Sequence, residues 1–236
     1  MTGGGVPGVE VRRGADRFAT VAEGRTTRHS FSFDRHYDPS NVSMGFLLAC
    51  NDDLLAPGAG YPLHPHRDLE IVTWVLSGAL RHEDSTGRGG VVVPGRVQRL
   101  SAGSGVVHSE VNDDPTPLRF VQMWVQPASP GGPPSYDQAS VSLGSSWVPL
   151  ATGHGEGAVH LGNPGAALSG ARLGAGDVVL LPEGPLLHLF VAGGSVEVEG
   201  VGALADGDAL RVHAGGGRRV TGVSGAPELL LWHLHR

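Results

Sequence analysis

The sequence predicts an all-β protein that is built from two domains. Glycine and proline are abundant, with 38 and 17 copies among 236 residues, and this abundance indicates many tight turns. Between the turns lie short runs of β-branched, aromatic and aliphatic residues at close and regular intervals, which is typical of a β-sandwich or β-barrel. The hydrophobic fraction of 40% and the charged fraction of 17% are typical of a globular protein.

Strand-like segments dominate the first half of the chain. Turn signals such as Ser77-Gly78, Thr86-Gly87 and Pro94-Gly95 separate them. The segments expected to form strands are residues 45–51, 69–76, 79–83, 90–93 and 118–125. Short strands with this spacing predict one barrel or sandwich in the first half.

A proline- and glycine-rich connector at residues 127–134 (PASPGGPP) predicts a domain boundary. We therefore expect domains at residues 1–130 and 131–236. In the second half, strands are expected at residues 178–181, 186–191, 195–199, 209–212 and 228–234. Residues 189–198 (LFVAGGSVEV) faintly repeat residues 73–82 (TWVLSGALRH): each has an apolar strand, a glycine turn and a second strand, which favours two copies of one β unit.

Charge and cysteine content exclude several classes of protein. The net charge of −6 argues against a nucleic-acid binder, which would normally have a basic face. The one cysteine, Cys50, cannot form an internal disulfide, which fits a reducing compartment. No apolar run approaches the length of a membrane span, and the first residues do not resemble a secretory signal. We expect a soluble, cytoplasmic protein.

Two short motifs suggest a metal site. In an extended strand, residues i and i+2 point to the same face, so His64 and His66 project together, as do His108 and Glu110. Three imidazoles and one carboxylate form a mixed nitrogen and oxygen donor set. Such a set suits iron, nickel, copper or zinc better than calcium or magnesium.

Other polar residues have simpler explanations. We expect Glu70 to be structural and to pair with Arg67, and His82 to lie at the surface or behind the metal ligands. Asp84 is expected in a solvated turn. The terminal His233-Leu234-His235 resembles the first histidine pair, but it has no third ligand nearby and is expected in an exposed final strand. Ser104 with His108 could suggest a hydrolase, yet no strand–elbow–helix pattern surrounds Ser104.

The motif residues also carry a resemblance to a known family. Residues 60–110 resemble the metal-binding cupin domain of the pirin family. The segments that match around them are residues 29–33 (HSFSF), 37–39 (YDP), 44–46 (MGF), 51–53 (NDD) and 122–125 (QMWV). The resemblance is specific over about residues 28–126 and weaker beyond.

The resemblance implies an all-β bicupin, with two cupin-type, jelly-roll-like barrels in tandem. Residues 1–130 would form the metal-binding domain, and residues 131–236 a degenerate cupin-like domain without metal ligands. The implied ligands are His64, His66, His108 and Glu110. They would bind one divalent transition metal ion, usually Fe(II), with zinc, nickel, copper and manganese as alternatives.

The resemblance further implies a quercetin 2,3-dioxygenase-like oxidoreductase. Its substrates would be a flavonol-like aromatic molecule and dioxygen, and Glu110 would be the catalytic base that accepts the flavonol hydroxyl proton. The substrate-binding residues remain unassigned. The alternative is a non-catalytic, iron-binding regulator that interacts with transcription or metabolic proteins. Neither reading includes direct binding of nucleic acid or of a membrane.

Overall fold

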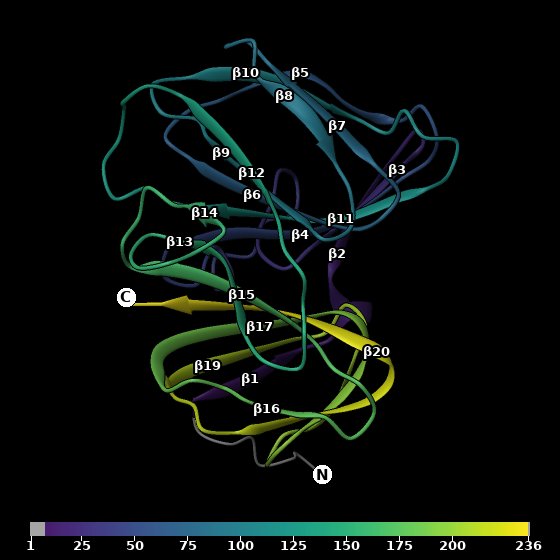
Figure 1. The fold of residues 1–236 in the computed structure, drawn as a ribbon, viewed down its shortest axis with the longest axis vertical. Coiled ribbons are helices and arrows are strands. Elements are labelled where there is room, and N and C mark those ends of the chain that lie inside the picture. The colour runs from purple at the N-terminus through teal and green to yellow at the C-terminus, as the bar shows by residue number, and fades with distance from the viewer. Residues whose placement is uncertain (1–7, 236) are drawn as a thin grey trace. The chain divides into compact units, whose positions relative to one another are not determined.

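The computed structural model describes residues 8–235, which are almost entirely β (Figure 1). The described residues form twenty strands and one short 3-10 helix, η1 (Gly14–Asp16). The all-β prediction is confirmed. The chain forms two compact units.

The two units are interleaved in the sequence. Residues 18–142 and 150–165 form one unit, called here the N-terminal unit, and the described residues up to Arg17 join residues 143–149 and 166–235 in the C-terminal unit. The sequence instead predicted one boundary after residue 130. The first strand, β1 (Val9–Arg12), belongs to the C-terminal unit because it pairs with β19, with Val9 opposite Val212.

The N-terminal unit contains two antiparallel sheets. The first has the strand order β12-β9-β6-β11-β4-β3-β2, and the second has the order β5-β10-β7-β8. The strands are β2 (Phe18–Ala22), β3 (Arg25–His29), β4 (Leu47–Leu55), β5 (Gly60–His66), β6 (Glu70–Ser77), β7 (Leu80–Asp84), β8 (Gly89–Val92), β9 (Arg96–Ser101), β10 (Val106–Val111), β11 (Leu118–Val125) and β12 (Ser135–Ser140). In addition, β14 (Val159–His160) pairs in parallel with residues 151–152 of β13 (Val148–Thr152).

The N-terminal unit contains two apolar clusters of buried side chains, and further buried apolar side chains such as Trp74 and Met123 lie outside them. One cluster includes Leu55, Leu118 and Phe120, and the other includes Ile71 and Leu100. These side chains are 0–1% exposed, so each cluster is a dry core that stabilises the strands around it.

The C-terminal unit has one sheet, with the order β1-β19-β17-β20-β15, in which β18 also pairs with β17 and β16 with β20. The strands are β15 (Ala166–Arg172), β16 (Val178–Leu180), β17 (Gly184–Val198), β18 (Gly202–Ala205), β19 (Ala209–Gly215) and β20 (Arg219–Leu234). One apolar cluster of leucine, valine and alanine side chains fills the core, with Leu189, Leu210 and Leu229 all fully buried.

The predicted glycine turn at residues 192–194 is wrong. Strand β17 runs continuously through this segment, and its pairing with β20 shifts register at Gly193 and again after Ser195. Gly194 has a φ of +71°, and a Cβ there would lie 2.6 Å from the carbonyl oxygen of Ser224. The glycines therefore mark a bulge in a long strand, a use of glycine that resembles a turn at the level of sequence.

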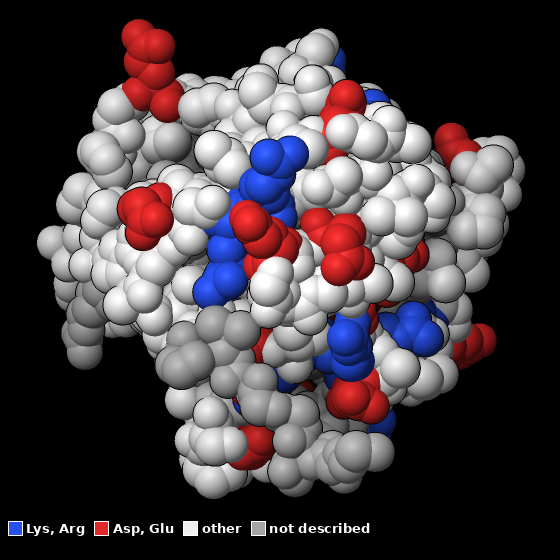
Figure 2. All heavy atoms as spheres, turned by 90° about the horizontal axis from the view of Figure 1, so that it is seen from below, with Lys and Arg blue, Asp and Glu red and all other residues white. Residues whose placement is uncertain are grey.

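Charged side chains are interspersed over the face shown in Figure 2, where acidic and basic groups lie among a mostly uncharged surface. Within the C-terminal unit, Arg172 pairs with Glu228 at 2.5 Å and Arg12 with Glu10 at 2.6 Å. Among residues 8–235, no helix has the length and apolar character needed to cross a membrane.

Candidate metal centre

Strands β5 and β10 position the predicted metal ligands. The two strands are antiparallel neighbours, with His108 opposite His64 and Val106 opposite His66. Alternation along each strand places His64, His66 and His108 on the same face of the sheet. The register then shifts between His108 and Glu110, so that Glu110 lies opposite Tyr61.

The three histidines form one tight group. Their ring centroids are 4.4 Å apart for His64 and His108, 4.8 Å for His64 and His66, and 5.0 Å for His66 and His108. One nitrogen of each ring lies within 4.8 Å of the other two. The structure therefore brings together the three imidazoles that the sequence motifs singled out.

Glu110 lies beside this group. Its carboxylate belongs to a second group of potential ligands, with His108 and His82, and it lines the same cavity as His64 and His66. Gln122 Nε2 donates a hydrogen bond to Glu110 Oε2 at 2.7 Å, and Trp124 Nε1 donates to Gln122 Oε1 at 3.0 Å. This chain of hydrogen bonds orients the carboxylate. Burial raises the pKa of Glu110 to about 7, so without a nearby cation its charged form is disfavoured.

The buried polar atoms of the site fit a metal ion. His66 Nε2, His108 Nε2 and Glu110 Oε1 are buried and have no hydrogen-bond partner among the described residues. His64 Nδ1 donates to the carbonyl oxygen of Pro62 at 2.8 Å, which leaves a lone pair on Nε2. Buried polar atoms without a partner are costly, and a divalent cation would pair all four. The donor set suits a divalent transition metal.

His66 and His108 are neutral, as metal ligands must be. Burial, with a smaller contribution from His64, lowers the pKa of His66 to about 4. Burial together with the neighbouring imidazoles of His64, His82 and His66 lowers the pKa of His108 to about 2. Near neutral pH each of these two rings therefore has a lone pair that it can donate to a metal ion.

A cavity of about 340 Å³ opens onto His64, His66 and Glu110. Phe33 and Trp124 provide aromatic walls. The rest of the lining is largely polar: Thr20, Arg25, Thr27, His29, Asp34, Asn51, Asp53, Tyr61, Pro62 and Gln122. A flat molecule with several hydroxyl groups would find apolar faces and hydrogen-bonding partners in the same pocket.

A hydrogen-bond network forms the polar wall of this cavity. Thr27 Oγ1 and Tyr61 Oη both donate to Asp53 Oδ1 at 2.5 Å. The Arg25 guanidinium lies over the Tyr61 ring, 4.1 Å from its centroid. Burial raises the pKa of Asp53 to about 6 and also raises the pKa of Tyr61. The network holds the phenol in a fixed position at the edge of the cavity.

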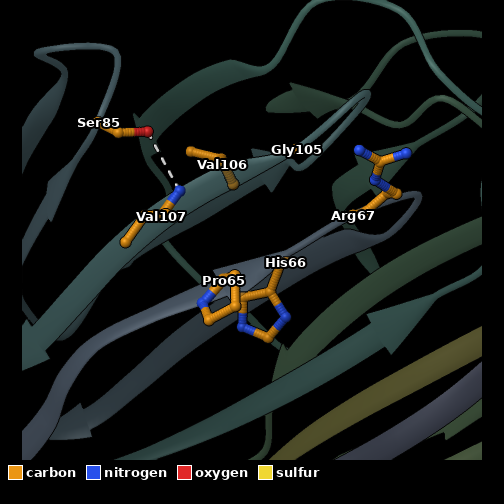
Figure 3. A pocket seen from close by; sticks show the side chains of 7 residues that line it. All are labelled: Pro65, His66, Arg67, Ser85, Gly105, Val106 and Val107. Atoms are coloured by element: carbon orange, nitrogen blue, oxygen red, sulfur yellow. Dashed lines mark hydrogen bonds between the residues drawn. The ribbon is translucent and has the colours of Figure 1, made fainter.

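A second hollow of about 370 Å³ lies beside His66 and is open to solvent (Figure 3). Ser85 follows β7 and joins it to β10 here: Val107 N–H donates to Ser85 Oγ at 3.1 Å, and Ser85 N–H donates to the Val107 carbonyl at 2.8 Å. These bonds hold the register between β7 and β10, the strand of the predicted ligands His108 and Glu110.

The predictions for Glu70, His82 and Asp84 can be compared with the structure. Glu70 is buried, and its Oε2 accepts hydrogen bonds from Ser101 Oγ at 2.7 Å and from Gly162 N–H at 3.2 Å, partners that make it structural. His82 is fully buried and contacts the predicted ligand His108, so the surface alternative is wrong. The prediction of a solvated turn at Asp84 is wrong, because its side chain is 1% exposed.

Several cavity-lining residues, such as Asp53 and Trp124, lie in segments that carry the family resemblance, but no sequence pattern predicted that they share a cavity. Thr27, Asp53 and Tyr61 come from three different strands, so only the folded sheet brings them together. His82 and Asp84 did carry a signal: they alternate in a strand, as His64 and His66 do, and this pattern could have placed both on the inner face.

Comparisons of this chain with a family model and with related proteins agree on one family. The family described as "Pirin" matches residues 10–125. A Mycobacterium bovis protein named "Putative quercetin 2,3-dioxygenase" is 50% identical, over 96% of this chain and 95% of its own length. A Caulobacter vibrioides protein named "Pirin-like protein" is 42% identical over 74% of this chain and 78% of its own length.

Solved structures share the fold. The Escherichia coli bacterial pirin YhhW in complex with nickel(II) has a TM-score of 0.87 and 26% identity, and the match covers 96% of this chain and 99% of that one. A quercetin 2,3-dioxygenase from Acinetobacter baumannii has a TM-score of 0.73 and 23% identity, with coverage of 95% and 85%. These likenesses support the predicted bicupin class.

Proposed function

This chain belongs to the pirin family, and we propose that it is a metal-dependent dioxygenase that opens the central ring of a flavonol such as quercetin. The proposal rests on one observation above all. Three grouped imidazoles lie beside a carboxylate, several of their ligand atoms are buried without partners, and His64, His66 and Glu110 border a cavity that has aromatic and polar walls.

We assign His64, His66, His108 and Glu110 as the ligands of one divalent ion, with Fe(II) as the ion in the cell. Zinc, nickel, copper and manganese would fit the same nitrogen and oxygen donors, and the related YhhW structure contains nickel(II). When bound, the ion supplies a positive centre that favours the flavonolate anion and its reaction with dioxygen.

The side chains around the site divide the remaining tasks. Phe33 and Trp124 enclose the flat rings, and the Asp53–Tyr61–Thr27 network meets the hydroxyl groups of the substrate. Glu110 accepts the proton of the flavonol hydroxyl, and Gln122 holds the carboxylate in position for that transfer. Dioxygen then adds both atoms to the opened product, and one carbon leaves as carbon monoxide.

The test is turnover with measured stoichiometry. Protein loaded with Fe(II) is mixed with quercetin in an oxygen electrode, and oxygen uptake, flavonol loss and carbon monoxide release are followed together. We expect one of each per turnover. A panel of flavonols that the metal-loaded protein leaves unchanged would reject the dioxygenase and favour the iron-binding regulator.

The role of Glu110 is tested by Glu110→Gln. Loss of a positioned general base typically lowers the rate by about 10²- to 10⁴-fold. The matched control is Glu83→Gln, which changes an exposed glutamate on β7. Metal content is measured in each variant, because Glu110 is also an assigned ligand. Full turnover by metal-loaded Glu110→Gln would show that another group takes the proton.

A further inference from the structure

Strand β7 places two further polar side chains behind the metal centre. It pairs with β10 in antiparallel fashion, with Asp84 opposite His108 and His82 opposite Glu110. Alternation therefore directs His82, Asp84, His108 and Glu110 to one face of the sheet. The Ser85–Val107 hydrogen bonds at the end of β7 hold this register, and Figure 3 shows the one that Val107 N–H donates to Ser85 Oγ.

His82 contacts the ligand His108 directly. The two Nδ1 atoms are 3.3 Å apart, and the side chains are 0% and 1% exposed. Two imidazoles at this distance share one proton, since one nitrogen must donate and the other accept. Because its Nδ1 is engaged in this way, His108 has Nε2 left for a metal ion.

Ligation through Nε2 sets the order of protons in the whole group. His108 then carries its proton on Nδ1 and donates it to His82 Nδ1. His82 must therefore carry its own proton on Nε2. That atom faces Asp84 Oδ2 at 3.7 Å, slightly longer than a hydrogen bond, and neither atom has a hydrogen-bond partner among the described residues.

Asp84 is held in place as an acceptor. Its Oδ1 accepts hydrogen bonds from Thr86 N–H at 2.8 Å, from Thr86 Oγ1 at 2.6 Å and from Arg88 N–H at 3.2 Å. Three donors on one oxygen favour the ionised carboxylate and fix its orientation. The second oxygen is left facing His82.

Tyr136 fixes the plane of the His82 ring. The two rings are stacked, with centroids 4.8 Å apart and planes 20° from parallel, and Tyr136 Oη donates to Gln98 Oε1 at 3.0 Å. His82 is thus held by stacking on one side and by polar groups at both nitrogens.

We propose that Asp84 and His82 form a relay of facing polar groups behind His108, which fixes the tautomer and orientation of this imidazole and strengthens Nε2 as a metal ligand. Both are positioning residues. The inference rests on the proposed metal site. Partners behind a ligand histidine typically contribute about 10- to 100-fold to metal affinity.

A competing arrangement makes His82 a ligand itself, because His82, His108 and Glu110 also form a group with ligand atoms within 4.8 Å of one another. The two arrangements differ in the number of imidazoles on the metal. With the relay, three imidazoles bind the metal both in the unaltered protein and in the His82 variants. In the competing arrangement, replacement of His82 removes one imidazole from the metal.

The test uses Co(II), which is bound independently of any turnover. His82→Leu, His82→Asn, Asp84→Asn and the control His160→Leu, an exposed histidine on β14, are compared with the unaltered protein. Affinity is measured by competition with a chelator, and X-ray absorption counts the imidazoles on the metal. NMR of the Co(II) protein follows the paramagnetically shifted Nδ1–H proton of His108.

We expect His82→Leu to weaken Co(II) binding by about 10- to 100-fold, with the imidazole count still three and faster solvent exchange of the His108 proton. His82→Asn, whose amide oxygen can accept from His108, should recover part of the loss. Asp84→Asn should give a smaller loss, and it tests the relay even where His82→Leu does not fold.

Two results would overturn the relay: a drop of one imidazole in the His82 variants, or a Co(II) affinity in all three variants within twofold of the unaltered protein. Failure of the proposed function looks different. In that case the unaltered protein binds no Co(II) at this site, or binds it without flavonol turnover.

Discussion

The two units differ in the side chains that they group. The N-terminal unit groups imidazoles beside a carboxylate, and the C-terminal unit groups leucine, valine and alanine side chains. In the C-terminal unit, one apolar cluster around Leu189, Leu210 and Leu229 fills the core. The N-terminal unit contains smaller apolar clusters and buries His108 and Glu110, each of which has a ligand atom without a hydrogen-bond partner among the described residues. Potential metal ligands are thus grouped in the N-terminal unit, and we expect this unit to carry the chemistry while the C-terminal unit contributes packing.

The largest expected effect is the loss of metal binding in His66→Ala. Partners behind a ligand contribute about 10- to 100-fold, so removal of a ligand should weaken Co(II) binding by more than about 100-fold. Chelator competition measures this, with the exposed His213→Ala of the C-terminal unit as the control. Equal affinities in the two variants would remove His66 from the site.

The converse change is Leu189→Ala in the C-terminal core, where the side chain is fully buried. Truncation of a buried leucine costs about 2–5 kcal/mol, and denaturant unfolding measures it. The exposed Val223→Ala, whose side chain is 52% exposed in the unaltered protein, should change stability by less than about 0.5 kcal/mol. Co(II) affinity should be unchanged in both, and a linked loss of affinity would show that the division of tasks is wrong.

Among its described residues, the C-terminal unit has one buried histidine, His188. Its burial leads us to expect that acid lowers the stability of the protein. Burial, with Arg211 and Arg17 nearby, lowers the pKa of His188 to about 3 from an ordinary value of 6.5. The unfolded chain therefore binds the proton more readily than the folded one between these values, so stability is present above pH 6.5 and is lost as the pH falls toward 3.

His188→Gln tests this sensitivity. From pH 7 to pH 5 the unaltered protein should lose about 2 kcal/mol more stability than the variant, which follows from about 1.4 kcal/mol for each unit of pKa shift. Unfolding curves at the two pH values measure the difference. Parallel losses in both proteins would contradict the assignment.

Asp53 in the cavity wall should give the smallest effect, with the opposite sign. Burial raises the pKa of Asp53 from 3.8 to about 6, so the folded state holds its proton more tightly and stability falls as the pH rises through this window. Asn in place of Asp53 keeps an acceptor for Thr27 and Tyr61 but cannot ionise. Between pH 5 and pH 8 the unaltered protein should lose about 1 kcal/mol relative to Asp53→Asn. An unchanged difference would contradict the raised pKa.

Local patterns in the sequence predict most of the strands. The segment expected at residues 118–125 is β11 in full, and the segment at residues 69–76 differs from β6 by one residue at each end. The pairing of β1 with β19 could not be predicted, because it joins residues about 200 apart by backbone bonds that any side chains permit. The prediction of a turn near Gly194 failed for a related reason, because glycine occurs in turns and in bulges alike.

The candidate site also has a part that local patterns predict and a part that only the fold brings together. His64, His66 and His108 could be found because alternation in a strand is a local rule, and β5 pairs with β10. The cavity wall could not, because Thr27, Asp53 and Tyr61 meet only through strand order in the folded sheets. The same local rule places His82 and Asp84 on the inner face, but their contact with His108 depends on the register of β7 against β10.

The central claim is tested most directly by diffraction from crystals of the metal-loaded protein, with data collected at the absorption edge of the metal. Our account predicts one anomalous peak per chain, at about 2.0–2.2 Å from one nitrogen each of His64, His66 and His108 and from an oxygen of Glu110. A peak elsewhere in the chain, or one at this site that the three imidazoles do not share, would contradict it.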